Sequence, residues 1–145
     1  MDNKIKLEDT CLTVEQATEL QALGVDMSDS IMVYCDYYDQ VHDYELLMNN
    51  NLSTSYAYEV VNTLTNTEML EILPKFEKYR LDIIVVDGFC YVQYIDEYNH
   101  VVHLKDINNT GYMLSREDIA VSIGKYTIRD GLFEMIKFLR TNKII

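Results

Sequence analysis

The dipeptide Asp87-Gly88 lies between two apolar runs, and it constrains the fold more than any other short stretch of the chain. Asp-Gly is typical of the two-residue type I′ turn, whose twist matches that of the strands it connects. Such a turn sets the register of the hairpin, so we expect Val86 to face Phe89. One face then carries Leu81, Ile83, Val85, Cys90, Val92 and Tyr94, all suited to a core. The other face is mixed, with Asp82, Ile84, Val86, Phe89, Tyr91 and Gln93.

A third strand is expected soon after this hairpin. The stretch from His100 to Leu104 follows a turn at 96–99 and would complete a three-stranded meander over about 80–105. The mixed face then needs a second layer, a dimer partner or a ligand to cover it. Apolar and aromatic area with one polar group is typical of ligand sites. The candidate ligand-binding residues are Ile84, Val86, Phe89, Tyr91 and Gln93. A bound nucleotide would also need bases such as Arg80, Lys105, Arg116 or Arg129 to converge there.

Helix signals occur at three other places. Two capping boxes, at 13–16 and 65–68, predict short helices over about 14–23 and 66–73. Apolar residues at helical spacing predict a longer helix over about 128–141.

Strand-like runs lie around 31–35 and 56–61, and residues 44–48 fit either a strand or a loop. The order of elements has no regular β-α-β alternation, which favours an α+β fold over a parallel doubly wound sheet. We therefore expect an antiparallel sheet packed by three or four helices, within a single domain over 1–145.

The charge of the chain is divided unevenly. From Leu7 to Pro74 there is no lysine or arginine but there are thirteen carboxylates, whereas residues 75–145 balance ten acids with ten bases. A field of one sign attracts cationic partners and repels nucleic acid and anionic lipid. We expect a basic protein surface as the partner, and neither nucleic acid nor a membrane.

Tyrosines and carboxylates alternate in part of this base-free stretch. Such a surface suits arginine- or lysine-rich partners, through cation–π contacts and paired carboxylates. Half-buried strand tyrosines beside solvated acids would give the same pattern. The candidate partner-binding residues are Asp36, Tyr37, Tyr38, Asp39, Asp43, Tyr44 and Glu45.

No sequence signature of catalysis or of a cofactor is present. The glycines form neither a P-loop nor a dinucleotide fingerprint, and no serine lies in a nucleophile elbow. A metal enzyme would have to use Asp36, Asp39, His42 and Asp43, but a solvated acidic turn explains the same residues. We expect no metal, no cofactor and no enzymatic activity.

The sequence also bears on the cellular setting. The three cysteines are far apart, which argues against a disulfide framework and a thiolate zinc site. No apolar run approaches the roughly 20 residues of a membrane span, and the first residues lack a secretory signal. These features predict a cytoplasmic protein.

Several phrases of the chain resemble a group of small acidic proteins encoded by Bacteroidales and their phages. They are Leu12–Gln16, Leu20–Ser28, Leu64–Lys75 and Ile128–Lys137, whereas 31–55 departs most from the resemblance. The resemblance carries no activity, but it implies a mobile-element setting in which small acidic proteins bind and block other proteins. We therefore expect a non-enzymatic interaction protein, such as a phage-type inhibitor of a host defence protein. The alternative is a small-ligand binder or nucleotide sponge, acting as a homodimer.

Overall fold

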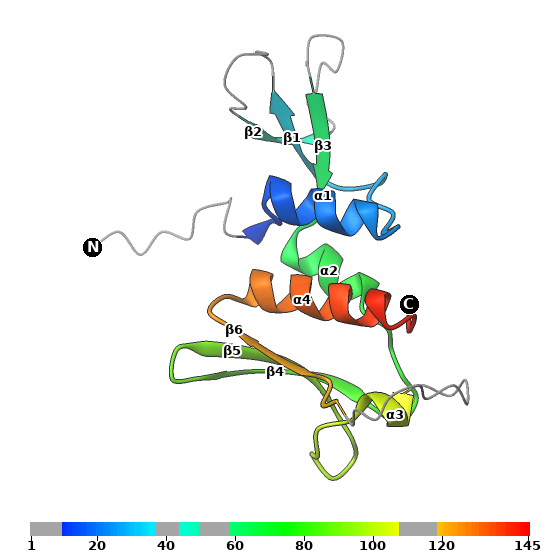
Figure 1. Ribbon diagram of the computed structural model, residues 1–145. Helices are drawn as coiled ribbons and strands as arrows, with labels where there is room; N and C mark the ends of the chain where they lie inside the picture. The colour runs from blue at the N-terminus through cyan, green and yellow to red at the C-terminus, as the bar shows by residue number, and fades with distance from the viewer. Residues whose placement is uncertain (1–9, 37–43, 50–58, 108–118) are drawn as a thin grey trace. The chain divides into compact units, whose positions relative to one another are not determined.

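The computed structural model describes residues 10–36, 44–49, 59–107 and 119–145 (Figure 1). The chain divides into two compact units, Met1–Glu71 (unit 1) and Ile72–Ile145 (unit 2). The α+β class is confirmed, since each unit combines helices with a three-stranded antiparallel sheet. No helix within the described ranges is both long and apolar enough to cross a membrane.

Unit 1 is built around a central buried strand. Strand β1 (Met32–Asp36) pairs antiparallel with β2 (Glu45–Met48) on one side and with β3 (Glu59–Thr63) on the other. All five residues of β1 are buried. The stretch 44–48, which fitted a strand or a loop, therefore contains a strand.

The two predicted capping boxes both form in unit 1. Helix α1 (Val14–Ala22) begins where the Thr13 hydroxyl accepts a hydrogen bond from the Gln16 amide at 3.2 Å, and the Gln16 side chain accepts one from the Thr13 amide. Helix α2 (Asn66–Ile72) begins with the equivalent exchange between Thr65 and Glu68. These side chains satisfy amides that a helix start leaves without partners. The bounds agree with the predictions to within one residue.

Unit 2 contains the hairpin that Asp87-Gly88 predicted. Strands β4 (Arg80–Val86) and β5 (Phe89–Ile95) pair in the expected register, from Val86 opposite Phe89 onward. Asp87 and Gly88 have φ values of 50° and 82°, as a type I′ turn requires at both central positions. Strand β6 (Ser122–Lys125) pairs with the other side of β5, so the sheet order is β4-β5-β6.

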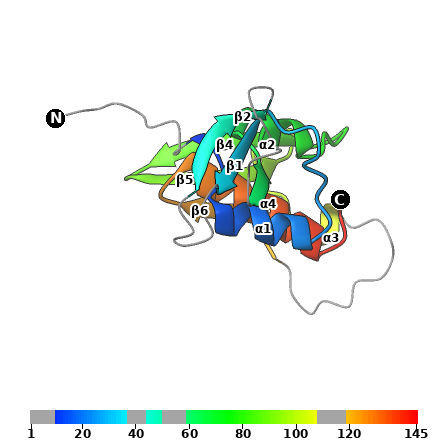
Figure 2. The same ribbon diagram turned by 90° about the horizontal axis from the view of Figure 1, so that it is seen from above.

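Helix α4 (Ile128–Thr141) covers one face of this sheet (Figure 1, and Figure 2 from above). It packs against β5 and β6, and it buries Cys90, Val92 and Tyr94 beneath it. Those three residues are on the face that the sequence assigned to the core. Val85 was assigned to the same face but is 71% exposed, because it lies next to the turn on the edge strand β4.

The third strand of this sheet is not where the sequence placed it. The turn at 96–99 forms, and Val101 makes an isolated bridge to Ile95. The chain then enters helix α3 (Leu104–Ile107), where the Asp106 carboxylate accepts a hydrogen bond from the His103 amide. This local cap competes successfully with continued strand pairing. The place beside β5 is taken by β6 instead.

Gly131 allows α4 to approach the sheet closely. A Cβ at this position would lie 2.8 Å from Cγ2 of Val92, which is fully buried. We expect Gly131→Ala to lower the free energy of unfolding by about 1 kcal/mol, because overpacking outweighs the gain in helix propensity. Urea denaturation would measure this. In a Val92→Ala background the same change should become stabilising, and a stabilised single variant would contradict the packing argument.

Candidate functional site

Tyr44 immediately precedes β2 and links that end of β2 to β3, the outer strand on the other side of the unit 1 sheet. Its hydroxyl donates a 2.7 Å hydrogen bond to Oε2 of Glu59, the first residue of β3. Asp36 pairs with Glu59, and Tyr44 lies one step beyond the pair of Cys35 with Glu45. Tyr44, Asp36 and Glu59 therefore form one row across the sheet. Directly opposed residues put their side chains on the same face, so the three side chains share a face.

Helix α1 brings a third carboxylate near this row. Glu15 lies in the first turn of α1 and is close enough to Tyr44 to act on its hydroxyl electrostatically. We call Glu15, Asp36, Tyr44 and Glu59 the acidic site. Within it Glu15 and Glu59 are exposed, Tyr44 is half-buried and Asp36 is only 1% exposed.

The potential at the acidic site is negative. The hydrogen bond to Glu59 raises the pKa of Tyr44 to about 12, and desolvation and the charges of Glu59, Asp36 and Glu15 act in the same direction. Each of these charges disfavours a phenolate and favours a bound cation. No lysine or arginine between Leu7 and Pro74 is available to neutralise them.

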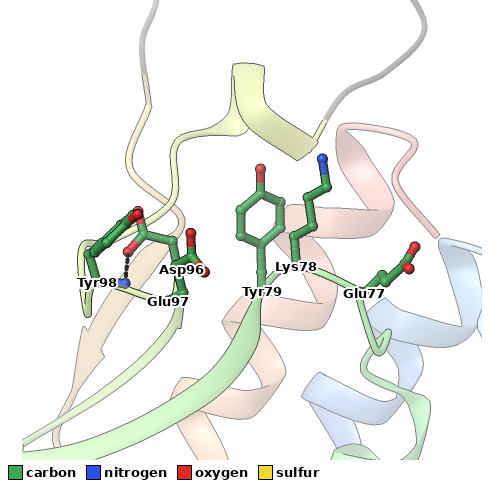
Figure 3. Close-up of a pocket in the computed structure, with 6 residues that line it drawn as sticks. All are labelled: Glu77, Lys78, Tyr79, Asp96, Glu97 and Tyr98. Carbon is green, nitrogen blue, oxygen red and sulfur yellow. Dashed lines mark hydrogen bonds between the residues drawn. The ribbon is translucent and has the colours of Figure 1, made fainter.

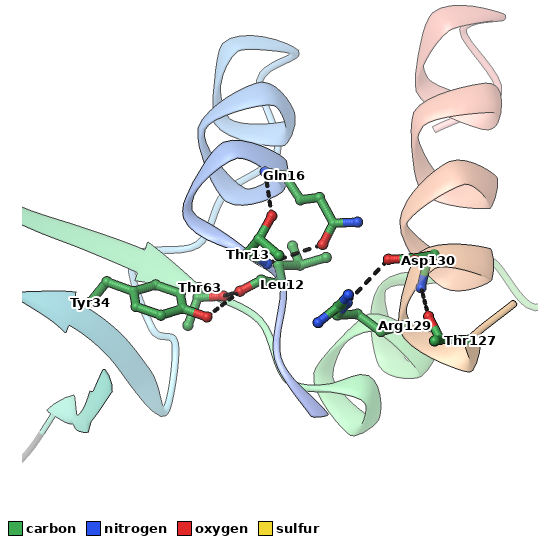
Figure 4. Close-up of polar contacts among 8 residues, drawn as sticks. All are labelled: Leu12, Thr13, Gln16, Tyr34, Thr63, Thr127, Arg129 and Asp130. Atoms are coloured by element: carbon green, nitrogen blue, oxygen red, sulfur yellow. Dashed lines mark hydrogen bonds and ion pairs between the residues drawn. The ribbon is translucent and has the colours of Figure 1, made fainter. Parts of the chain in front are cut away.

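Tyr34 holds the ring of Tyr44 in place. The two rings meet edge to face, with centroids 6.5 Å apart and planes at 85°. Tyr34 is itself fixed, because its hydroxyl donates to the Leu12 carbonyl at 2.8 Å (Figure 4). The same carbonyl accepts from the Thr63 hydroxyl at 2.9 Å. One backbone oxygen therefore ties β1 and β3 to the segment that leads into α1.

The structure brings together only part of the predicted partner-binding set. Asp36 and Tyr44 meet in the acidic site, whereas Glu45 is exposed on the opposite face of the sheet. Asp36 is not a solvated carboxylate, because it belongs to the central strand of the sheet and is only 1% exposed. The remaining members lie outside the described residues: Tyr37, Tyr38, Asp39 and Asp43, together with His42 of the metal alternative.

Glu15 and Glu59 were not singled out from the sequence. Their signal was present, since both belong to the base-free stretch. Glu59 comes beside Tyr44 through the register of β3 against β1, which no short turn sets, and Glu15 comes there through the packing of α1 against β3. No group of three or more metal-ligating side chains is arranged to hold a metal ion in the parts of the chain that the structure describes.

The alternative ligand-binding residues do share one face in unit 2. Ile84, Val86, Phe89, Tyr91 and Gln93 all lie on the side of the sheet opposite α4. We call this the outer face.

Two residues missed in the sequence shape the outer face. A Cβ on Gly124 would lie 2.7 Å from Cε1 of Tyr91, so the Tyr91 ring lies directly over the β6 backbone. Tyr126 stacks on Phe89, with centroids 4.7 Å apart, and is 77% exposed. The polar member, Gln93, is already bonded to Asp82 and Ser122.

The bases that a nucleotide would need are engaged elsewhere or lie outside the described ranges. Arg80 donates to the side chain of Asn99, and Arg129 pairs with Asp130 at 3.1 Å (Figure 4). Arg116 lies outside the described residues, and Lys105 belongs to α3. By strand alternation Arg80 lies on the outer face, as Ile84 and Val86 do, but its guanidinium is bonded to Asn99, so the described part of this face presents mainly apolar and aromatic side chains.

A cavity of about 470 Å³ in unit 2 lies between the segments before β4 and after β5 (Figure 3). It is lined by Glu77, Lys78, Tyr79, Asp96, Glu97 and Tyr98. Asp96 is committed to its own turn, since it accepts hydrogen bonds from the His100 and Tyr98 amides. These bonds lower the pKa of Asp96, the His100 amide most strongly.

Comparison of the chain with family models, with curated proteins and with solved structures found no match.

The shared Leu12 carbonyl predicts a non-additive effect on stability. We expect Tyr34→Phe and Thr63→Val each to lower the free energy of unfolding by about 1 kcal/mol, since each leaves the oxygen one donor. The double variant should lose more than the sum, because the buried oxygen then has no side-chain donor. Chemical denaturation would measure all three. Additive losses would mean that the two hydroxyls act independently.

Proposed function

We propose that the protein is a non-enzymatic interaction protein whose acidic unit binds a basic surface of a macromolecular partner. One observation carries this proposal. Tyr44 is held among three carboxylates in a stretch of 68 residues that contains no lysine or arginine. An aromatic ring beside carboxylates is the chemistry that receives an arginine or lysine side chain.

The division of charge between the units supports the same proposal. Unit 1 contains fourteen acidic and two basic residues, a net charge of -12, whereas unit 2 contains ten of each. Most of the described carboxylates of unit 1 are exposed: Glu15, Glu19, Asp26, Asp29, Glu45, Glu59 and Glu71. Attraction of a cationic partner is therefore concentrated on one unit and acts over about a Debye length, roughly 10 Å at 0.1 M salt.

A single basic side chain can use the acidic site in a defined way. A guanidinium over the Tyr44 ring gains a cation–π contact, and its N–H groups can donate to Glu59 and Glu15. Glu59 keeps acceptor capacity for this, because the Tyr44 hydroxyl bonds to one of its two oxygens. At neutral pH the Tyr44 phenol is neutral, as an ordinary tyrosine is, and its pKa raised to about 12 extends this to higher pH, so it adds no charge of its own.

The class of partner follows from the resemblance to small acidic proteins of Bacteroidales and their phages. In a mobile-element setting, a compact acidic unit suits an inhibitor that covers a cationic surface of a host defence protein. We propose this as the biological form of the interaction.

A synthetic arginine-rich peptide is a defined probe of the acidic site. We expect Glu15→Gln/Glu59→Gln to weaken its binding about fivefold or more, because two charge-assisted contacts are lost. Tyr44→Ala should weaken it too, through loss of the ring. Isothermal titration calorimetry at low salt would measure both, and binding of the unmodified protein should fall steeply as salt rises.

Asp29→Asn/Glu71→Gln is the matched control, since it removes the same formal charge from exposed positions. Asp29 precedes β1, whose first residue pairs with the last residue of β3, so it lies beyond the opposite end of the strand from Asp36. This control should retain most of the peptide affinity. Equal losses in the two double variants would refute a specific site and leave only a diffuse acidic surface.

We keep a second candidate, binding of a flat aromatic ligand on the outer face, because Phe89 and Tyr126 already stack there. In a thermal-shift screen, a ligand at 100 times its Kd adds about 2.7 kcal/mol of stability. The shift should vanish in Phe89→Ala/Tyr126→Ala and persist in Tyr44→Ala. A screen of nucleobases, nucleotides and cyclic dinucleotides that leaves the unmodified protein unshifted would contradict this candidate.

A further inference from the structure

Strand β4 is an open edge of the unit 2 sheet. Among the described residues it pairs only with β5, so its other side has no neighbouring strand. It is seven residues long and mostly apolar. At its turn end Ile84, Val85 and Val86 are 40%, 71% and 48% exposed. An exposed apolar edge of this length is a template for pairing with another strand.

The turn determines which backbone groups face outward. In a type I′ hairpin the residues on either side of the turn hydrogen-bond to each other, here Val86 and Phe89. Backbone groups alternate in direction along a strand, so Ile84 and Asp82 also face β5. Leu81, Ile83 and Val85 therefore direct their N–H and C=O groups to the open side.

We propose that β4 pairs with β4 of a second copy of this chain, antiparallel and centred on Ile83. The three outward residues are symmetric about Ile83, so each copy offers the same donors and acceptors to the other. Ile83 would then lie opposite Ile83 of the second copy, and Leu81 opposite its Val85. Roughly six backbone hydrogen bonds form across the two-fold axis. The two sheets join into one of six strands.

The side chains fit this register. In the proposed pair, Val86 lies opposite Arg80 of the second copy, whose aliphatic stem can cover it. Asp82 lies opposite the partner's Ile84 and is already held within its own sheet by Gln93. No proline interrupts the strand, and its charges are confined to Arg80 and Asp82. β4 therefore has few of the features, such as proline and charged side chains, that usually prevent an edge strand from pairing with another chain.

The charges of the two units favour pairing of two copies of the chain through the unit 2 sheet, and not through the unit 1 sheet. Unit 2 carries ten acids and ten bases, so two copies meet there without net repulsion. The edge strands of the other sheet, β2 and β3, belong to the unit with a charge of -12 and begin with Glu45 and Glu59, and the second edge of the unit 2 sheet, β6, has only four residues. Like charges at those edges oppose self-pairing.

Sedimentation equilibrium over micromolar concentrations tests the proposal. We expect a monomer–dimer equilibrium in the unmodified protein, and Val85→Lys should raise the dimer dissociation constant about tenfold or more by placing a charge at the edge. Val85 is 71% exposed, so the variant should fold, which circular dichroism can verify. Val60→Lys, at a 39% exposed position of β3, is the matched control and should leave the equilibrium unchanged.

Disulfide trapping tests the register. Opposed residues of a hydrogen-bonded pair have Cα atoms about 5.5 Å apart, within the range of a disulfide, so Ile83→Cys should give a covalent dimer on mild oxidation. Val85→Cys should not, since two Val85 positions would be separated by about 13 Å along the strands. The native cysteines are all buried. A monomer at every concentration, a dimer unaffected by Val85→Lys, or a dimer lost in Val60→Lys would each overturn the proposal.

Discussion

The Leu12 carbonyl is the acceptor on which the arrangement of unit 1 depends. Unit 1 folds without any lysine or arginine between Leu7 and its end, so the ion pairs that tie together many small proteins have no basic partner over that range. Buried hydrogen bonds take their place. Two side-chain hydroxyls, from β1 and β3, converge on this one oxygen. Because Tyr34 also supports the Tyr44 ring, the same oxygen indirectly sets the geometry of the acidic site.

The elements that the sequence predicted correctly are those determined by interactions between residues close together in the chain. The Asp87-Gly88 turn fixes seven residue pairs of the hairpin, since a two-residue loop leaves one register. The capping boxes place the starts of α1 and α2 for the same reason. β6 escaped prediction because its four residues carry little pattern, and its pairing with β5 joins distant parts of the chain. Val101 begins the expected return, but the His103–Asp106 cap diverts the chain into a helix.

The acidic site was only half predicted for a related reason. Alternation places Tyr34 and Asp36 on one face, and that was readable from the strand itself. Glu59 joins them through the pairing of β1 with β3, whose connection is not a short hairpin. Glu15 joins through the packing of α1 against β3. Composition identified the stretch in which the site lies, whereas tertiary pairing selected its members.

The distribution of charge has a practical consequence for chemical mapping. Trypsin cuts after lysine or arginine, so residues 7–75 leave a complete digest as one peptide, whether or not the protein was folded. Over Leu7–Pro74 there is likewise no side-chain amine for acylating reagents or for ubiquitin attachment. Carbodiimide coupling joins a carboxylate to an amine. A link through a side chain of that stretch would therefore join one of its carboxylates to an amine that lies outside the stretch. Which of the two linked peptides supplied the carboxylate is then known before either peptide is sequenced.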